Sequence, residues 1–333
     1  MHKQHINMLE CPVCHGDLIW EIKEQKGDRV INAEIICSKC KADYEVRDEI
    51  AVFLTPDLPR NDLWEKGESG LEKHFKENPE IYKELMTTPE EELNGADYWF
   101  KASYLDMKGN YEESSRMYKR THEKIYTQDS INGLKSQKEF VIKNIENDND
   151  TIVDIASGKG YLVEAMLQDT NNYIIATDFS PIILERNREY FKFKGLYEKL
   201  SLIAFDARKT PFKNNSIQIM TSNVGIQNIE DPGNVIDEMN RITKGKFMSI
   251  MHLIDENDKV HIELFENYGG LDYATKERAK DTFKRNSWNS EIQNSFMAEI
   301  KPTPTGKILD GGQIDGFPIQ DTKVEFCVIV ASK

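Results

Sequence analysis

The sequence has no apolar run of 18 residues, and its first residues, Met1 to His5, have no apolar stretch of the signal-peptide kind. A membrane-spanning helix needs about 20 largely apolar residues, so we expect a cytoplasmic protein without membrane contact. Positive charge is also scarce, because 43 Lys and Arg face 57 Asp and Glu, giving a net charge of −14. Such a chain repels a phosphate backbone, which argues against DNA and weighs against RNA as a partner.

Cysteine is scarce too, yet four of the five cysteines occur in two closely spaced pairs. The pairs are C-x-x-C knuckles, Cys11 with Cys14 and Cys37 with Cys40, and 22 residues separate them. Two such knuckles supply the four thiolates of a closed, tetrahedral zinc site that leaves no position for water or substrate. We therefore predict structural Zn²⁺ on these cysteines, with His15 as an alternative ligand. Redox use is disfavoured because neither pair lies in a βαβ pattern.

The segment around the knuckles is a small module. Residues 17–22 and 29–36 predict two short strands, and a unit of this size has too little core to fold without the metal. Residues 37–54 follow C-x-x-C-x-x-x-Y-x-V-R-D-x-I-x-V-x-L. With residues 9–18, they resemble the small zinc-ribbon activator subunit of tRNA, rRNA and release-factor methyltransferases. The resemblance covers about residues 6–56, and we predict a zinc-ribbon domain at residues 1–58.

The next segment, residues 59–145, is predicted to be a helical insert or lid. It follows a linker at residues 55–60 whose two prolines interrupt regular structure. Apolar residues such as Leu71 and Phe75 then recur at helical spacing. Aromatic residues are frequent between positions 98 and 126. They either line a substrate pocket or pack the helical layer on a sheet, and the sequence leaves both alternatives open.

The most informative stretch is residues 151–160, T-I-V-D-I-A-S-G-K-G, in which an apolar run ends in a turn of small residues. A helical pattern follows, so the stretch predicts a strand, a tight turn and a helix. Gly158 and Gly160 allow backbone to approach a ligand closely, and the helix directs its N–H groups into the turn. Two later apolar runs end at Asp178 and Asp206. A carboxylate after the second strand can accept hydrogen bonds from both ribose hydroxyls, which predicts a nucleoside site.

This loop resembles the D-x-G-x-G-x-G loop of class I S-adenosylmethionine-dependent methyltransferases, with Ala156 in place of the first glycine. The resemblance extends over about residues 135–333. It implies an α/β fold with a Rossmann-like, seven-stranded sheet whose last strand is antiparallel, which we assign to residues 146–333. It also implies that S-adenosyl-L-methionine is the cofactor and is held by Asp154, Ala156, Ser157, Gly158, Gly160, Asp178, Phe179, Asp206, Ala207 and Asn223.

The resemblance assigns roles to these positions. The glycine turn holds the amino-acid part of the cofactor, Asp178 the ribose and Asp206 the adenine edge, while the loop that begins at Asn223 faces the methyl group and the substrate. Nicotinamide- and flavin-binding folds use similar turns, but their G-x-G-x-x-G spacing is absent here. A further alternative is a degenerate fold that binds the cofactor without catalysis, with Ala156 as the sign of decay.

Few residues are needed for the reaction itself, because in-line methyl transfer depends mostly on positioning. Asn223 is the candidate for orienting the acceptor, together with the nearby Gln227 and Asn228. His252, placed just after a fifth strand at residues 247–251, is the candidate base. An Asn-Pro-Pro-Tyr motif is missing, which argues against methylation of amino groups on adenine or glutamine. Cys327 lies in an apolar final strand, which argues against a cysteine relay.

The predicted function is methyl transfer from S-adenosyl-L-methionine to an acceptor, and a small molecule is favoured over RNA as that acceptor. The net charge and the aromatic insert favour the small molecule, whereas the combination of zinc ribbon and methyltransferase favours rRNA or tRNA. A regulatory protein that binds the cofactor without turnover is the alternative outside enzymes. We also expect a long helical stretch at residues 258–300. The residue pattern leaves the oligomeric state open.

Overall fold

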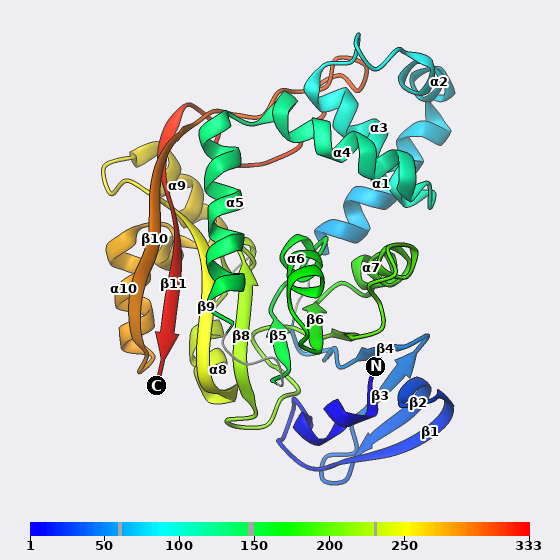
Figure 1. Ribbon diagram of the computed structural model, residues 1–333, viewed down its shortest axis with the longest axis vertical. Helices are drawn as coiled ribbons and strands as arrows, with labels where there is room; N and C mark the ends of the chain where they lie inside the picture. Colours follow the sequence, from blue (N-terminus) through cyan, green and yellow to red (C-terminus); the bar gives the residue numbers. More distant parts are fainter. Residues whose placement is uncertain (59–61, 146–149, 230–231) are drawn as a thin grey trace.

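One mixed sheet joins the whole molecule, which we describe from a computed structural model of residues 1–58, 62–145, 150–229 and 232–333 (Figure 1). Its eleven described strands follow the order β1-β2-β3-β4-β7-β6-β5-β8-β9-β11-β10. The strands are β1 (Leu18–Lys26), β2 (Arg29–Cys37), β3 (Asp43–Arg47), β4 (Ile50–Val52), β5 (Ile152–Asp154), β6 (Ile174–Asp178), β7 (Leu200–Ala204), β8 (Ile217–Asn223), β9 (Thr243–Ile254), β10 (Asn289–Ile300) and β11 (Thr322–Ser332).

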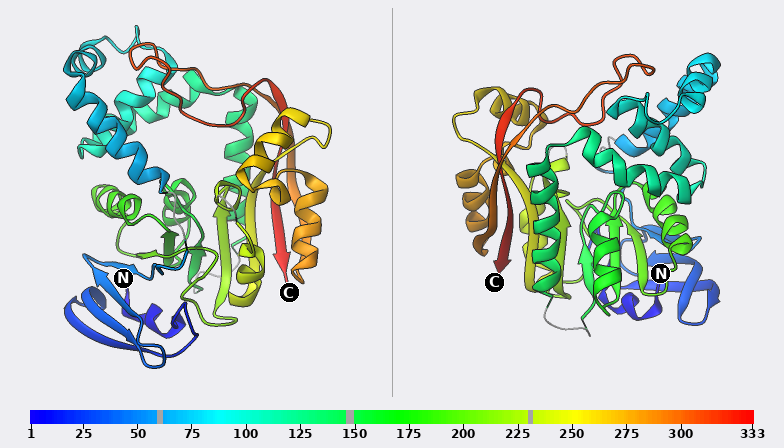
Figure 2. Two further views of the ribbon diagram at one scale, coloured as in Figure 1. Left: turned by 180° about the vertical axis from the view of Figure 1, so that it is seen from behind. Right: turned by 45° about the horizontal axis from the view of Figure 1, so that its top comes forward.

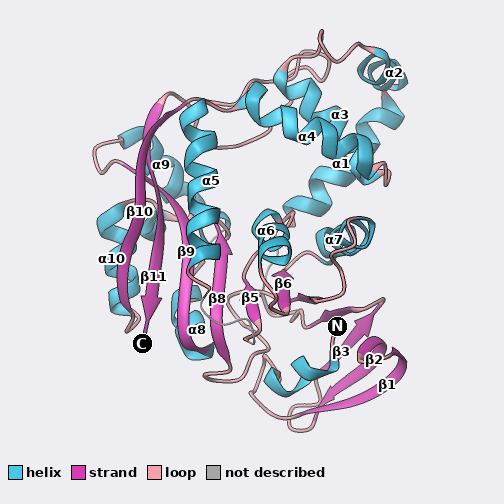
Figure 3. Ribbon diagram, viewed as in Figure 1, coloured by secondary structure: helices cyan, strands magenta, loops and turns pink. Residues whose placement is uncertain are grey.

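Helices lie on both faces of this sheet and beyond one of its ends (Figure 3). They are α1 (Leu63–Glu77), α2 (Pro79–Thr87), α3 (Gly95–Met107), α4 (Tyr111–Ile125), α5 (Gln128–Lys143), α6 (Tyr161–Asp169), α7 (Pro181–Phe193), α8 (Val235–Ile242), α9 (Lys259–Tyr268) and α10 (Lys276–Arg285). Three short 3₁₀ turns, η1 (Lys3–Met8), η2 (Ile226–Asn228) and η3 (Leu271–Tyr273), complete the described elements. None of the described helices is long and apolar enough to cross a bilayer.

The seven strands β5 to β11 confirm the predicted Rossmann-like topology. Strands β7, β6, β5, β8 and β9 are parallel neighbours, and β11 lies antiparallel between β9 and β10. All residues of β5, β6 and β7 are buried, because α5, α6 and α7 cover one face of the sheet, while α8, α10 and apolar side chains of residues 1–53 cover the other. The continuous apolar runs of these strands are typical of parallel strands buried on both faces.

The sheet nevertheless has more than the seven strands expected, because the N-terminal module extends it. Strand β4 pairs in parallel with β7, from Ile50 opposite Leu202 to Val52 opposite Ala204, and β3, β2 and β1 follow outward. The backbone N–H of Phe53 also donates to the carbonyl of Ala204 (2.7 Å). The expected strands at residues 17–22 and 29–36 are present as β1 and β2.

The side chain of Arg29 fastens the module to the rest of the molecule. Its guanidinium donates to the carbonyls of Leu200 (2.9 Å) and Tyr197 (3.0 Å) and lies over the Tyr197 ring at 4.4 Å. Residues of the module, including Phe53, share one apolar core with β5 to β9. The domain boundaries expected after residues 58 and 145 adjoin residues 59–61 and 146–149, which lie outside the described residues, so this division stays a prediction.

The expected helical stretch at residues 258–300 is wrong in its last third. Helices α9 and α10 are present, but Asn289–Ile300 forms the edge strand β10. This segment mixes polar and apolar residues without a clear period, so its own pattern does not decide between helix and strand. Antiparallel pairing with β11, from Asn289 opposite Ser332 to Ile300 opposite Thr322, supplies the backbone partners that fix it as a strand.

The helical insert lies beyond the carboxyl ends of the parallel strands, together with the connection between β10 and β11 (Figure 2). We call these two segments the roof, residues 62–127 and 301–321. Asp97, which is 1% exposed, accepts hydrogen bonds from the backbone N–H groups of Lys307 (2.9 Å), Ile308 (3.1 Å) and Leu309 (3.2 Å). One buried carboxylate therefore holds together two parts of the roof that are 200 residues apart in sequence.

Replacing Asp97 by alanine should release the 307–309 segment. The substitution leaves backbone N–H groups without an acceptor, which we expect to lower the free energy of unfolding by about 1–3 kcal/mol and to speed amide hydrogen exchange at residues 307–309 at least about tenfold. Hydrogen exchange read by mass spectrometry measures this. Asp310→Ala, an exposed acid in the same loop, is the matched control, and equal exchange in both variants would contradict the anchoring role.

Candidate functional site

The turn between β5 and α6 has the backbone conformation that its small residues suggest. Gly158 (φ +51°) and Gly160 (φ +74°) are left-handed, and so is Ala156 (φ +52°). A Cβ on Gly160 would lie 3.1 Å from the ring of Phe191, so this glycine also meets a steric demand. Alanine pays roughly 1–2 kcal/mol for a left-handed conformation. Position 156 therefore keeps the geometry of a glycine despite its Cβ, and the turn is not distorted by the substitution.

Hydrogen bonds from the neighbouring strand end fix the turn. Asp178, the last residue of β6, accepts from the N–H of Gly158 through Oδ2 (3.0 Å) and from the N–H of Ser180 through Oδ1 (3.1 Å). Ser157 donates its N–H to the carbonyl of Thr177 (2.7 Å). Asn187 of α7 donates to the carbonyl of Gly158 (2.8 Å). The predicted residues of the first two strand ends are thus brought into direct contact.

Two buried carboxyl groups lie at these strand ends. Burial raises the pKa of Asp178 to about 6 and that of Asp154 also to about 6. Asp154 accepts from the hydroxyl of Thr221 through Oδ1 (2.6 Å), while its Oδ2 has no hydrogen-bond partner among the described residues. Buried, under-satisfied carboxylates beside open left-handed backbone suit a ligand that brings hydroxyl or ammonium donors.

At the end of β7, the surroundings of Asp206 differ from those expected for a contact with the adenine edge. Asp206, which follows β7, is paired with Arg208: Oδ1 accepts from Nε (2.9 Å) and Oδ2 from Nη2 (2.7 Å). Ala207 beside it is 8% exposed. The Asp206 carboxylate is therefore neutralised by its own loop, and hydrogen bonding to an adenine edge would need its remaining lone pairs. Phe179, after β6, is half-buried.

The fourth strand end is strained. Asn223 closes β8 half-buried, and its side chain has no hydrogen-bond partner among the described residues. Val224 follows with φ +59°, an outlier for a β-branched residue. A Cβ on Gly225 would lie 2.7 Å from the carbonyl oxygen of Ala156. The loop after β8 thus packs directly against the glycine turn, and the side-chain amide of Asn223, which has no partner among the described residues, lies where the two meet.

His252 is placed differently from the expectation, since it lies within β9 rather than after it. Its ring lies 4.4 Å from that of Phe326, and burial lowers its pKa to about 4. Gln227 bridges backbone instead of facing an acceptor: its amide donates to the carbonyls of His252 (2.9 Å) and Tyr273 (2.8 Å). His252 is therefore a neutral histidine in a packed environment near neutral pH.

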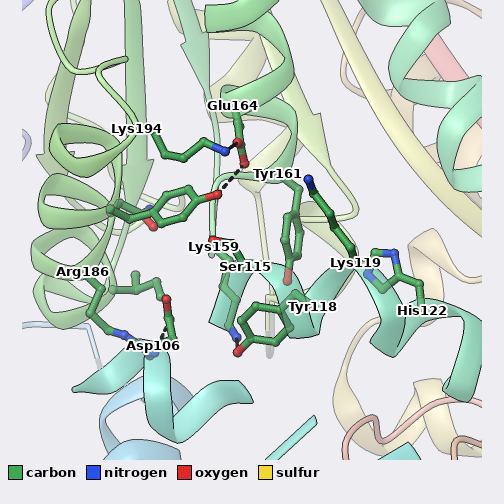
Figure 4. Close-up of a pocket in the computed structure, with 13 residues that line it drawn as sticks. Asp106, Ser115, Tyr118, Lys119, His122, Lys159, Tyr161, Glu164, Arg186 and Lys194 are labelled. Atoms are coloured by element: carbon green, nitrogen blue, oxygen red, sulfur yellow. Dashed lines mark hydrogen bonds and ion pairs between the residues drawn. The ribbon is translucent and has the colours of Figure 1, made fainter. Parts of the chain in front are cut away.

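Lys159, which the sequence did not single out, links the turn to the roof. Its ammonium donates to the hydroxyl of Tyr118 (2.7 Å) (Figure 4). It also lies over the rings of Tyr118 (4.5 Å) and Trp99 (5.1 Å). Arg186 of α7 forms a second link through an ion pair with Asp106 of α3 (2.6 Å). The only sequence signal was the frequency of aromatic residues in the insert, which gave no partner for Lys159.

The four paired cysteines converge within the N-terminal module. Their sulfur atoms all lie within 4.8 Å of one another, with Cys11 and Cys40 at 3.6 Å and Cys14 and Cys37 at 3.5 Å. Tetrahedral Zn–S bonds of about 2.3 Å imply sulfur separations near 3.8 Å, so the group fits zinc. His15 is not part of it, because its Nδ1 pairs with Glu10 at 2.7 Å.

Packing around the sulfurs explains why a glycine follows the first knuckle. A Cβ on Gly16 would lie 3.2 Å from the sulfur of Cys37 and 3.3 Å from that of Cys14. The backbone N–H groups of Lys39 and Cys40 point at the Cys37 sulfur, each at 3.4 Å. Such N–H donors stabilise a thiolate, which is the form that binds a metal.

Comparison with known proteins shows similarity to methyltransferases over part of the chain. Residues 153–247 match the family model of a methyltransferase domain. The chain is 29% identical over 160 residues to a demethylmenaquinone methyltransferase of Bacteroides fragilis, covering 47% of this chain and 63% of the relative. It is 28% identical over 102 residues to a ubiquinone/menaquinone biosynthesis C-methyltransferase of Legionella pneumophila, covering 29% of this chain and 41% of the relative. The chain thus spans about half the length of these relatives.

Among solved structures, a geranyl diphosphate C-methyltransferase from Streptomyces coelicolor matches with a TM-score of 0.42 and 12% identity, over 60% of this chain and 80% of that one. The matched family segment runs from β5 to β9 and holds the glycine turn and the ends of β6, β7 and β8. Residues 153–247 thus match a methyltransferase domain over the segment that holds the predicted cofactor loops.

Proposed function

We propose that this protein binds S-adenosyl-L-methionine at the carboxyl ends of β5, β6 and β8 and transfers its methyl group to a small-molecule acceptor. The observation that carries the proposal is the left-handed turn at residues 156–160, clamped to the buried carboxylate of Asp178. That arrangement offers open backbone to an amino-acid group and a carboxylate to a pair of hydroxyls. Asp154, Ser157, Gly158 and Gly160 complete the proposed cofactor contacts.

The bound cofactor supplies a methyl group on a positively charged sulfur. What the chain must add is position, since an in-line displacement needs the acceptor atom, the methyl carbon and the sulfur in a row. Asn223 is the proposed orienting group, because its unpaired amide stands beside the strained loop of β8. His252 remains the proposed base: it is neutral near pH 7, but a pKa of about 4 makes it a weak proton acceptor, and its packed position within β9 limits its reach.

A small acceptor is favoured over RNA. The roof stands over the carboxyl ends of the strands, which suits a ligand that can be enclosed. The net charge of −14 opposes a polyanion. The relatives named for menaquinone and ubiquinone act, by those names, on small molecules. We place the reaction in the cytoplasm, where thiols stay reduced and available to zinc.

We also propose that the four cysteines hold one structural Zn²⁺ ion. Four thiolates leave no coordination position for a substrate. The ion would fix the two knuckles of a module that continues the sheet through the pairing of β4 with β7, the strand that leads into the loop of Asp206. Its role would therefore be to stabilise the edge of the cofactor site.

Removing the metal should destabilise the protein without emptying the cofactor site directly. Structural zinc in small modules contributes roughly 10 kcal/mol to folding, and 1 kcal/mol moves the melting temperature by about 2–4 °C in domains of 150–250 residues. We expect one zinc per chain by elemental analysis, and a chelator to lower the melting temperature by more than about 10 °C. Cys14→Ala should lose the zinc, whereas Cys327→Ala, a buried cysteine outside the group, should keep it. Zinc retained in Cys14→Ala would contradict the site.

S-adenosylhomocysteine should bind in isothermal titration, and NADH should not. Asp178→Ala should weaken that binding about 10- to 100-fold, since hydrogen bonds to a charged group contribute about 1.5–3 kcal/mol each. Asp169→Ala, an exposed acid on α6, is the control and should bind as the wild type does. Unchanged affinity in a folded Asp178→Ala variant would remove Asp178 from the site.

The pH dependence gives the same site a second signature. The ribose hydroxyls would donate to the charged carboxylate, so affinity should fall as pH drops below the pKa of Asp178, about 6. Stability without ligand should move the other way: between about pH 4 and 6 the folded form binds more protons than the unfolded form, so it gains stability as pH falls. Asp178→Asn should flatten part of the affinity profile, and Asp154, a further proposed cofactor contact whose pKa is also about 6, should account for the remainder.

Turnover decides between the enzyme and its alternatives. The purified protein, given methyl-labelled S-adenosylmethionine and a cell extract divided into RNA and small-molecule fractions, should label the small-molecule fraction. The Asp178→Ala variant should label it at least about tenfold more slowly. Label confined to RNA would overturn the acceptor class. Cofactor binding with no label in any fraction would favour the regulatory protein.

A further inference from the structure

A cavity of about 360 Å³ lies between the insert helices α3 and α4 and the helices α6 and α7 (Figure 4). Lys159 is the residue of the glycine turn that lines the cavity, and Asp154, Asp178 and Asn223 are not among the lining residues. It is therefore separate from the proposed cofactor contacts, although it shares one wall with them. Its volume lies within the range of small-molecule sites, which is about 300–1,000 Å³.

The charge of this cavity is opposite to that of the whole chain. Four cations line it, Lys119, Lys159, Arg186 and Lys194, against two acids, Asp106 and Glu164. Both acids are neutralised within the wall, because Asp106 pairs with Arg186 (2.6 Å) and Glu164 with Lys194 (3.1 Å). Lys159 is hydrogen-bonded to a neutral tyrosine. Lys119 stands at the exposed rim with no ion-pair partner among the described residues.

Aromatic rings form much of the remaining wall. Tyr118 and His122 come from α4, Tyr161 from α6 and Tyr190 from α7. The rings of His122 and Tyr161 lie edge to face at 6.4 Å, and Tyr161 remains 42% exposed although it faces the cavity. The hydroxyl of Tyr190 is used to donate to Glu164 (3.1 Å). Several ring faces thus surround the space, and such faces favour stacking or edge contact with a flat ligand.

We propose that this cavity is a second binding site, for a planar, ring-bearing molecule with one negative charge. The rings of Tyr118 and Tyr161 would contact the flat part, and Lys119 and Lys159 would bind the anionic group. The small volume of the cavity fits a small molecule rather than a polymer. Because Lys159 belongs both to this wall and to the glycine turn, occupancy of one site should change affinity at the other, equally in both directions.

The test uses 2-naphthoate as the probe and 2-naphthamide, its neutral counterpart of nearly the same shape. Isothermal titration of the full-length protein, without any cofactor, should give affinity for 2-naphthoate at least about tenfold above that for 2-naphthamide, with the difference shrinking as salt is raised. Lys119→Gln should reduce 2-naphthoate affinity about tenfold. Lys83→Gln, an exposed lysine of α2 outside the cavity, should leave it unchanged.

A second variant tests the location independently of charge. Ser115 lines the cavity on α4, so Ser115→Trp should fill the space and abolish 2-naphthoate binding while the melting temperature confirms folding. Equal affinity for the acid and the amide, no binding of 2-naphthoate at 1 mM, or wild-type affinity in a folded Ser115→Trp variant would each overturn the proposal. Because the titration uses no S-adenosylhomocysteine, its result is independent of whether the cofactor site is correct.

Discussion

The carboxylate of Asp178 is the group on which the arrangement of the proposed site depends. It ends β6, yet it fixes the turn that leaves β5, because Oδ2 accepts from Gly158 and Oδ1 from Ser180. One buried side chain thus joins two strand ends and the start of α7. This explains why three left-handed residues, one of them alanine, are tolerated in so short a turn. The carboxylate is costly to bury, and its raised pKa reflects this cost.

Around that clamp, the molecule builds its site from parts far apart in sequence. The N-terminal module adds β4 to the edge at β7 and so supports the loop that carries Asp206 and Arg208. The roof is fastened on its far side by Asp97, and near the turn by Lys159 and Tyr118. The N-terminal module, the sheet and the roof therefore converge on the carboxyl ends of the strands. A change in any one of them can reach the proposed cofactor site through direct contacts rather than over a distance.

The two uses of positive charge in this acidic chain deserve comparison. Arg29 and Arg208 are structural: the first binds carbonyls and a ring at the module junction, and the second neutralises Asp206. Lys119 has no ion-pair partner among the described residues, and it lines the cavity beside the tyrosines. Charge without a structural partner, beside a cavity, is more informative about function than total charge is. The net charge of −14 therefore does not exclude a small anionic ligand, because the cations that line the cavity create a local positive potential.

The sequence by itself determined the elements whose signal is local. A glycine turn between an apolar run and a helical pattern, two acids after further apolar runs, and two C-x-x-C knuckles each depend on residues close in the chain, so the topology of β5 to β9 and the sulfur cluster could be predicted. Tertiary structure decided what depends on distant partners. Residues 289–300 form a strand because they pair with the backbone of β11, and the sheet has more than seven strands because β4 pairs with β7. His252 lies within β9, and Lys159 donates a hydrogen bond to Tyr118, 41 residues earlier in the chain. Hydrogen bonds and packing between residues that are distant in the chain outweigh the local preference of a segment for helix or strand. No short stretch of sequence contains both residues of such a pair, so the pairing cannot be read from it.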